Sequence, residues 1–246
     1  MRRHDLLAGL HQRLRPRTYL ELGVSTGSSM SLSRARSIGV DPAFTVKREV
    51  RCDLQLVRST SDEFFARPDP LAHFEGVPVD LAFVDGMHLA EYALRDVVNV
   101  ARHAHPATVV VLDDMLPRNH DEASRDRRRG HGAWAGDVFK VLDVLRSTAP
   151  DLTVIEVDTA PTGVAVVLGL AAAHEALLAA YDDVLPALLG PDPQQVPARV
   201  LERSDARDPA GLLESGLWGE LAALREAGPG LEPGAVRDAL RRHLGG

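Results

Sequence analysis

Two apolar segments of the sequence stop abruptly on carboxylates. The segment LAFVDGMH reaches Asp85 and has His88 three residues later, and the segment ATVVVLDD ends on Asp113 and Asp114. Both segments are suited to be buried strands. The carboxyl ends of neighbouring parallel strands meet at one edge of a sheet, which is where such sheets bind their ligands. We therefore expect three carboxylates and one imidazole to lie together at that edge.

Three carboxylates in one place need a positive charge. Without a cation they repel one another by an amount on the order of several kcal/mol at low effective dielectric. Hard divalent cations prefer oxygen ligands, and Mg²⁺ keeps water or substrate oxygens in its remaining positions. The pattern predicts a site for Mg²⁺, or another hard divalent cation, with Asp85, Asp113 and Asp114 as ligands. A substrate hydroxyl on that cation becomes more acidic and then needs a proton acceptor.

His88 is the candidate proton acceptor. It is expected to begin the next helix, with its ring over the same rim as the carboxylates. The positive end of a helix disfavours imidazolium, so the ring should stay neutral and able to accept a proton. A lone histidine is more often a helix cap or a surface residue, but the neighbouring acids favour a catalytic role here.

A second constellation lies nearer the start of the chain. In ELGVSTGSS a strand ends on Glu21, and the following turn carries Gly23, Ser25, Gly27 and Ser28. Glycine permits a tight turn and close approach of a ligand to backbone N–H groups, and a helix N-terminus favours a carboxylate or phosphate. The spacing differs from GxGxxG, and the sequence has no GK[ST] of a phosphate-binding loop.

Asp41 closes the next expected strand, 20 residues after Glu21. An acid at that point can accept hydrogen bonds from both hydroxyls of a ribose. Each feature alone is common as an ordinary turn or strand end. The two in register predict an adenosine-containing ligand with a small anionic end.

Strands and helices must alternate to position these groups. Strands are expected at 18–23, 37–41, 53–59, 79–86 and 107–114, and helices at 3–14, 28–36, 88–103 and 137–147, the last behind Asp137 as N-cap. Helix-length segments between short apolar strands imply parallel pairing through crossovers. Two more strands, 152–157 and 163–170, are joined by DTAPTG, whose Pro and Gly suit a tight turn. The expected fold class is α/β, a Rossmann-like, doubly wound, mostly parallel sheet with a C-terminal antiparallel hairpin.

The amino-acid composition changes after residue 170. Alanine- and leucine-rich helical stretches are expected at about 172–189, 196–204, 210–227 and 234–244. We therefore expect two parts, an α/β domain at 1–170 and a helical C-terminal extension at 171–246. Trp218 stands at helical spacing among leucines and is expected in the core or in a dimer contact.

The glycine turn resembles the first motif of class I S-adenosylmethionine-dependent methyltransferases, E/D-x-G-x-x-x-G. The matching residues are Glu21, Gly23 and Gly27, with Asp41 as the acid that ends the second strand. The resemblance covers about residues 15–170. It implies that the N-terminal part is a methyltransferase domain and that the donor, S-adenosylmethionine, is its cofactor.

The resemblance also implies roles for single residues. The glycine loop, with Ser25 and Ser28, would hold the methionine portion of the donor, and Asp41 would hold the ribose. The turn after the third strand, with Ser61 and Asp62, would contact the adenine edge.

The acids resemble those of a metal-dependent subfamily, the O-methyltransferases of macrolide and related natural-product sugars. Their pattern D-G-x-H matches Asp85, Gly86 and His88, and their paired acid matches Asp113 and Asp114. In catechol-type relatives the second acid of that pair is asparagine. The resemblance implies Mg²⁺-dependent methylation of a hydroxyl on a small natural-product acceptor, most of all a sugar moiety in antibiotic or secondary-metabolite biosynthesis.

Other functions remain open at this point. They are catechol-type phenolic O-methylation, an NAD(P)-dependent oxidoreductase on a similar sheet, and a non-catalytic nucleoside-binding module. The oxidoreductase is disfavoured because the glycine spacing is wrong for it and because it needs no acidic triad.

A polar loop, MLPRNHDEASRDRRRGHGAWAG, follows Asp114 and is a candidate lid over the reaction edge. Its candidate acceptor contacts are Arg118, His120, Arg127, Arg128, Arg129 and Trp134. The arginine tract, with Arg125, would suit an anionic acceptor such as a nucleotide-linked sugar, or it is simply a solvated charge run. Trp134 is expected to form an acceptor wall or to anchor the loop. As alternative bases, His120 and His131 rank below His88.

The composition excludes several classes of protein. The 246 residues carry a net charge of −7, which argues against broad nucleic-acid binding. The single cysteine, Cys52, excludes an internal disulfide and the common structural zinc sites. There is no apolar run of membrane-span length and no secretion signal at the start. We expect a cytoplasmic protein that does not bind membranes, and a homo-oligomer is compatible with its C-terminal helices.

Overall fold

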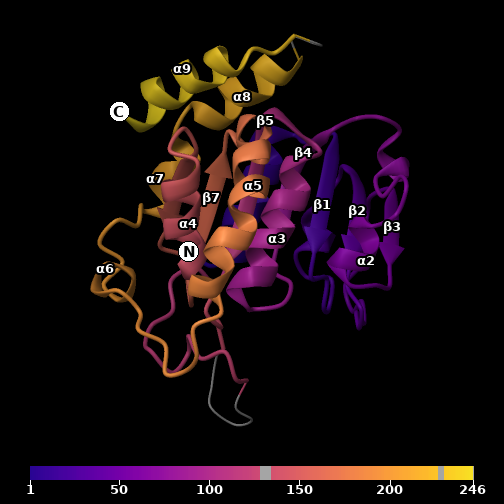
Figure 1. Ribbon diagram of the computed structural model, residues 1–246. Helices are drawn as coiled ribbons and strands as arrows, with labels where there is room; N and C mark the ends of the chain where they lie inside the picture. Colours follow the sequence, from indigo (N-terminus) through magenta and orange to yellow (C-terminus); the bar gives the residue numbers. More distant parts are fainter. Residues whose placement is uncertain (128–133, 227–229, 246) are drawn as a thin grey trace.

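A seven-stranded sheet runs through the centre of the fold (Figure 1). The computed structural model describes residues 1–127, 134–226 and 230–245. The strands are β1 (Thr18–Leu22), β2 (Arg36–Val40), β3 (Leu54–Val57), β4 (Val79–Val84), β5 (Ala104–Asp113), β6 (Thr153–Val157) and β7 (Val164–Leu168). Their order is β3-β2-β1-β4-β5-β7-β6, and β7 runs antiparallel to both neighbours in an otherwise parallel arrangement. The predicted fold class and its closing hairpin are confirmed.

Helices cover both faces of this sheet. They are α1 (Arg3–Leu14), α2 (Ser61–Phe65), α3 (Ala90–Ala101), α4 (Lys140–Thr148), α5 (Leu170–Leu188), α6 (Ala198–Leu201), α7 (Pro209–Glu214), α8 (Leu217–Glu226) and α9 (Pro233–Leu244), with 3₁₀ turns η1 (Met30–Leu32) and η2 (Ala72–Phe74). In Figure 1, α3 and α5 cross one face of the sheet, while α8 and α9 lie together at the top of the view. Among the described residues, no helix combines the length and the apolar character that a membrane span requires.

Each face of the sheet has its own apolar core. Along β5, Val110 and Leu112 pack with α3, α4 and α5, whereas Val109 and Val111 pack with α1, α8 and α9. Successive strand side chains point to opposite faces, so an unbroken apolar run such as ATVVVL serves both cores at once. This explains why the central strands read as continuous apolar segments rather than as alternating ones.

The C-terminal helices belong to the second core. Trp218 of α8 is fully buried beside Leu6 and Leu10 of α1 and Leu240 of α9. Its indole Nε1 donates a hydrogen bond of 2.7 Å to the carbonyl of Leu212. The structure therefore places Trp218 in the core, where its one polar atom has a partner.

The predicted helix at 28–36 is wrong. The structure has only the 3₁₀ turn η1 there, and residues 41–53, between β2 and β3, contain no helix. The hydroxyl of Ser31 donates to the carbonyl of Ser28 at 2.8 Å, and Ser33 Oγ accepts from the amide of Ala35 at 3.1 Å. Serine side chains that bond to nearby backbone compete with a helix, and this segment is rich in them.

Asp137 was predicted to cap the helix that follows it, and this is wrong. Helix α4 begins three residues later, at Lys140, with Phe139 as its N-cap. Asp137 is fully buried, and its Oδ1 accepts a hydrogen bond of 2.9 Å from the amide of Ala90, the first residue of α3. The carboxylate thus serves the helix that follows β4 instead of its own.

A buried acid joins the elements at the opposite edge of the sheet. Asp80, at the start of β4, accepts hydrogen bonds from Arg17 Nε at 2.9 Å, Arg17 Nη2 at 2.8 Å and His105 Nε2 at 2.8 Å, and Arg225 Nη1 lies 3.5 Å away. Burial alone would raise the pKa of Asp80, but the hydrogen bonds from Arg17 and His105 hold it well below its ordinary value. One carboxylate thereby ties β4 to the residue before β1, to β5 and to α8.

Replacing Asp80 tests this junction. We expect Asp80→Ala to lower the free energy of unfolding by about 3 kcal/mol, since it leaves buried Arg225 with only the exposed carboxylate of Glu226, and hence to lower Tm by roughly 6–12 °C. Calorimetry measures the change. The control is Asp53→Ala, which removes an exposed ion pair with Arg36 and should change stability by less than about 0.5 kcal/mol. Equal effects of the two variants would contradict the structural role of Asp80.

Candidate active site

The glycine turn after β1 is shaped by its contact with the end of β4. Gly23 has φ +95°, and a Cβ at this position would lie 1.8 Å from the carbonyl oxygen of Asp85. Gly27 has φ +76°, with Val46 within about 3.0 Å of where its Cβ would be. Only glycine lets the two strand ends approach so closely. The turn predicted to hold the donor therefore lies directly against the acid at the reaction edge.

Glu21 lies beneath this turn and faces no solvent. Its carboxylate accepts hydrogen bonds from Tyr19 Oη at 2.7 Å and from Ser29 Oγ at 2.6 Å, and the residue is fully buried. Burial raises the pKa of Glu21 to about 8; the two hydrogen bonds oppose that rise, and the charges of Asp85 and Asp41 add to it. The structure thus places Glu21 as a support of the turn and not as a surface that a ligand meets.

Asp41 ends β2 at the same edge and remains partly exposed. Its Oδ2 accepts a hydrogen bond from the amide of Ser25 at 2.7 Å, and its Oδ1 accepts one from the amide of Ala43 at 2.6 Å. Each carboxylate oxygen keeps a free lone pair, so ribose hydroxyls could still donate to it. Ser28, next to Gly27, has its hydroxyl 3.2 Å from that of Thr26.

The predicted adenine edge lies at the start of α2. Ser61 is the first residue of that helix, and the Asp62 carboxylate pairs with Arg95 of α3 at 2.5 Å. Behind them lies Asp96, which is 2% exposed and whose Oδ1 has no hydrogen-bond partner among the described residues. Burial raises the pKa of Asp96 to about 7, and a hydrogen bond from Ser61 opposes the rise. The sequence reasoning missed Asp96, although an acid on the apolar face of α3 was a signal.

The acidic groups and the histidine do converge at the carboxyl ends of β4 and β5. His88 Nε2 lies 3.2 Å from Asp85 Oδ1, and His88 Nδ1 lies 3.2 Å from Asp114 Oδ2. Asp114 has φ +61° and accepts a hydrogen bond from the hydroxyl of Thr162. The imidazole therefore sits between two carboxylates from neighbouring strands.

Arg3 of α1 enters the same cluster and was not foreseen. Its guanidinium lies 2.5 Å from Asp113 Oδ2, 3.8 Å from Asp85 Oδ2 and 4.0 Å from Asp114 Oδ1. Even so, burial and the charges of Asp85 and Asp114 raise the pKa of Asp113 well above its ordinary value, and Arg3 only opposes that rise. Arg3 supplies part of the positive charge that the acids need. The cluster still carries more negative than positive charge.

The expectation that the helix N-terminus keeps His88 neutral is wrong. Helix α3 begins at Ala90, two residues after His88, so the nearer carboxylates decide its charge. Burial alone would lower the pKa of His88, but the hydrogen bond to Asp85 and the charges of Asp114 and Asp85 raise it above its ordinary value.

The groups present fit a hard divalent cation. One ligand atom from each of Asp85, His88 and Asp114 lies within 4.8 Å of the others. The enclosed space beside them is about 10 Å³, which suits a single ion or water. Carboxylate oxygens match Mg²⁺, and the imidazole nitrogen also matches transition dications. Asp113, predicted as a ligand, faces Arg3 in this arrangement.

The loop after β5 places its candidate residues in different surroundings. Arg118 pairs with Glu122, and His120 Nδ1 accepts a hydrogen bond of 3.2 Å from the amide of Val196. Arg127 lies over the ring of Trp134, with 5.4 Å from guanidinium to ring centroid. Arg128, Arg129 and His131 lie outside the described residues.

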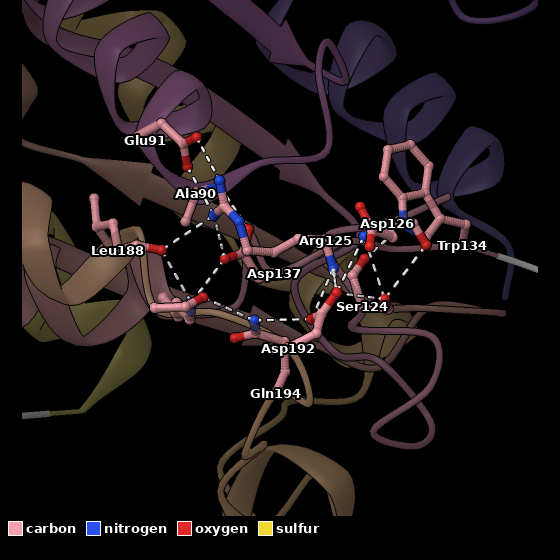
Figure 2. Close-up of polar contacts among 12 residues, drawn as sticks. Ala90, Glu91, Ser124, Arg125, Asp126, Trp134, Asp137, Leu188, Asp192 and Gln194 are labelled. Carbon is pink, nitrogen blue, oxygen red and sulfur yellow. Dashed lines mark hydrogen bonds and ion pairs between the residues drawn. The ribbon is translucent and has the colours of Figure 1, made fainter. Parts of the chain in front are cut away.

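Arg125, expected to contribute to an anion grip, is occupied by the protein itself. It forms ion pairs with Glu91 at 2.6 Å and Asp137 at 2.7 Å, and Nη1 donates to the carbonyl of Leu188 at 3.1 Å (Figure 2).

Trp134 stacks on the ring of His88, with 4.8 Å between ring centroids and 12° between ring planes. The two predicted roles of Trp134, acceptor wall and loop anchor, stay predictions.

Comparison with known proteins gives one family match. Residues 20–115 match the family model described as a methyltransferase domain. This span contains the glycine turn, Asp41 and the whole acid cluster except Arg3. The chain matches no curated protein sequence at a significant level.

Solved structures with a similar fold include two O-methyltransferases. One, from Streptomyces achromogenes, is involved in tomaymycin synthesis and was solved with SAM; it is 18% identical, has a TM-score of 0.48, and the match covers 68% of this chain and 78% of that chain. The other, from Bacillus cereus, was solved with SAH; it is 13% identical, with a TM-score of 0.47, 67% of this chain and 80% of that chain.

The buried carboxyl of Glu21 makes stability depend on pH. Its pKa is about 8 in the folded protein against 4.5 as the ordinary value, so the folded state holds the proton more tightly. The stability that this gives is complete below about pH 4.5 and is lost as pH rises through about 8, by up to roughly 5 kcal/mol. We expect Glu21→Gln, which cannot ionise, to lose less stability than wild type over this interval in urea denaturation at a series of pH values.

A matched control is Glu175→Gln, at a carboxylate that is 90% exposed, which should follow the wild-type pH profile. If the free energy of unfolding changed with pH in the same way for wild type and Glu21→Gln, the raised pKa of Glu21 would be contradicted.

Proposed function

We propose that this chain, an S-adenosylmethionine-dependent methyltransferase, methylates a hydroxyl oxygen of a small-molecule acceptor with the help of a divalent cation. The observation that carries the proposal is the convergence of Asp85, His88 and Asp114 directly beside the glycine turn. Methyl transfer from a sulfonium to an oxygen requires a donor site and a means of deprotonating a hydroxyl in adjacent positions.

The donor is proposed to occupy the edge formed by the ends of β1 and β2. Gly23 and Gly27 have no side chains that would keep its amino acid portion away from the turn, and the Asp41 carboxylate accepts from its ribose hydroxyls. Ser61 and Asp62, at the start of α2, are the proposed contacts of the adenine edge. Glu21 supports the turn from below.

The proposed cation ligands are the carboxylates of Asp85 and Asp114, with Asp113 completing the acidic surroundings. When bound, Mg²⁺ supplies positive charge that stabilises the oxyanion of the acceptor. Arg3 lies within 4.0 Å of all three acids and moderates their mutual repulsion.

His88 is the proposed base. It accepts the proton of the acceptor hydroxyl, and the resulting oxygen attacks the methyl carbon of the donor in line with the carbon–sulfur bond. The electron pair of that bond stays on sulfur, so S-adenosylhomocysteine and a methyl ether leave. The protein contributes mainly alignment of the two reactants and the placement of charge at the reacting oxygen.

The proposed acceptor is a natural-product sugar, free, nucleotide-linked or on an aglycone. The paired acids Asp113 and Asp114 support a sugar over a catechol, since catechol-type relatives have asparagine at the second position. Arg127 over Trp134, with Arg128 and Arg129 beside it in the sequence, supports an acceptor that carries negative charge. A phenolic diol remains the alternative within the same chemistry.

Methyl transfer from labelled donor to a panel of sugars, nucleotide sugars and catechols tests the proposal. We expect transfer to a sugar hydroxyl, stimulated by Mg²⁺ and abolished by a chelator. His88→Gln should lower kcat about 10²–10⁴-fold, because the base is lost, while the Kd for S-adenosylhomocysteine changes little. Full activity of His88→Gln, or full activity in chelator, would contradict the base or the cation respectively.

Replacing Arg3 tests the charge balance of the cluster. We expect Arg3→Met to tighten Mg²⁺ binding about tenfold, because a competing positive charge leaves the carboxylates. Titration calorimetry with Mg²⁺ measures the affinity. The control is Arg2→Met, one residue away, for which the affinity should stay within about twofold of wild type. Weaker Mg²⁺ binding by Arg3→Met than by wild type would contradict the proposed site.

A further inference from the structure

Arg125 is at the centre of a polar cluster with the buried carboxylates of Glu91 and Asp137 (Figure 2). Its guanidinium donates from Nη2 to Glu91 Oε1 at 2.6 Å and from Nη1 to Glu91 Oε2 at 3.0 Å, which is a two-point contact that lysine cannot reproduce. Asp137 Oδ2 accepts from both Arg125 Nη1 and Lys140 Nζ, each at 2.7 Å. These partners come from α3, from the residues before α4 and from α4 itself.

The same residue fixes the chain on its other side. The amide of Arg125 lies 3.1 Å from both carboxylate oxygens of Asp192, and Ser124 Oγ donates to Asp192 Oδ2 at 2.8 Å (Figure 2). The carbonyl of Ser124 accepts a hydrogen bond of 2.7 Å from Trp134 Nε1. The position of the indole is therefore set by the residue next to Arg125.

Trp134 contacts His88 in two ways, by stacking of the rings and by a hydrogen bond with the backbone. The two rings stack, and the carbonyl of Trp134 accepts a hydrogen bond of 2.9 Å from His88 Nδ1. Stacking fixes the plane of the imidazole, and the contact with the carbonyl fixes the direction in which Nδ1 points. Gly136 lies against the same residue, since a Cβ there would be 1.7 Å from the carbonyl of His88.

Asp137 connects Arg125 to the backbone near His88. While one of its oxygens binds Arg125, the other accepts from the amide of Ala90, two residues after His88. The backbone that follows the imidazole is thus tied to the same cluster.

We propose that Arg125 and Trp134 are positioning residues for His88: Arg125 fixes the neighbouring Ser124, whose carbonyl binds the indole, and Trp134 sets the plane and orientation of the imidazole. The effect on rate rests on the proposed function, in which His88 is the base. The geometry itself does not rest on it, because the stacking of the two rings can be observed in the protein without substrate.

The first test is spectroscopic. In protein labelled with ¹³C and ¹⁵N at histidine, the ring protons of His88, assigned by their loss in His88→Gln, should be shifted upfield by the indole. Trp134→Ala should remove the upfield shift, and Arg125→Lys should reduce it. Unshifted His88 protons in wild type, or an unchanged signal in Trp134→Ala, would overturn the proposal.

The second test separates positioning from folding. Arg125→Lys and Trp134→Ala should lower kcat about 10–100-fold, with the Kd for S-adenosylhomocysteine changed by less than about threefold. The matched control is Arg225→Lys, at a buried arginine that pairs with Asp80 at the opposite edge of the sheet; it should lower Tm but leave both kcat and the His88 signal unchanged. Wild-type kcat in both Arg125→Lys and Trp134→Ala would overturn the proposal.

These readouts also separate the two proposals. If His88→Gln retains methyl transfer while the upfield shift depends on Trp134 and Arg125, the base assignment fails and the positioning geometry stands.

Discussion

The balance of charge at the carboxyl ends of β4 and β5 is the constraint on which the reaction edge depends. Asp113 and Asp114 are largely withdrawn from water, and burial together with mutual repulsion raises the pKa of both carboxyls. Folding can tolerate this arrangement only with positive charge nearby. The protein brings Arg3 from its first helix and His88 from the turn after β4, and the same deficit is what would hold a dication.

Strand register, rather than any loop, brings the two halves of the site together. The amide of Asp85 donates to the carbonyl of Leu22, and Gly23 has no side chain to keep the ends of β1 and β4 apart. Because a donor on the turn and an acceptor at the acids are placed by neighbouring parallel strands, their separation is set by the sheet itself. The buried carboxyl of Glu21 fixes the turn from below and does so largely as the protonated acid.

The sequence predicted the sheet edge well, since the features that define it are local. Apolar runs that stop on Asp41, Asp85 and Asp113 are visible without knowledge of tertiary contacts, and so is the Pro–Gly turn of the final hairpin. Ion pairs between residues far apart in the sequence could not be predicted. The chain is rich in arginine, and nothing in the sequence distinguishes Arg3 and Arg125, which pair with acids of the fold, from the other arginines. Asp137 has the right type to be a cap, but which helix it caps depends on packing. The segment 28–36 has helical spacing, and serine hydroxyls that bind its own backbone decide against a helix.

Helix α1 carries Arg3 into the acid cluster at one end and packs Leu6 and Leu10 against Trp218 along its length. Through Trp218 of α8, the last quarter of the sequence is therefore part of what holds a charged group at the reaction edge. A shortened enzyme ending near residue 170 would present the apolar side of α1 to water and leave Arg3 on a loosened support. The smallest fragment worth making as a catalyst includes α8 and α9.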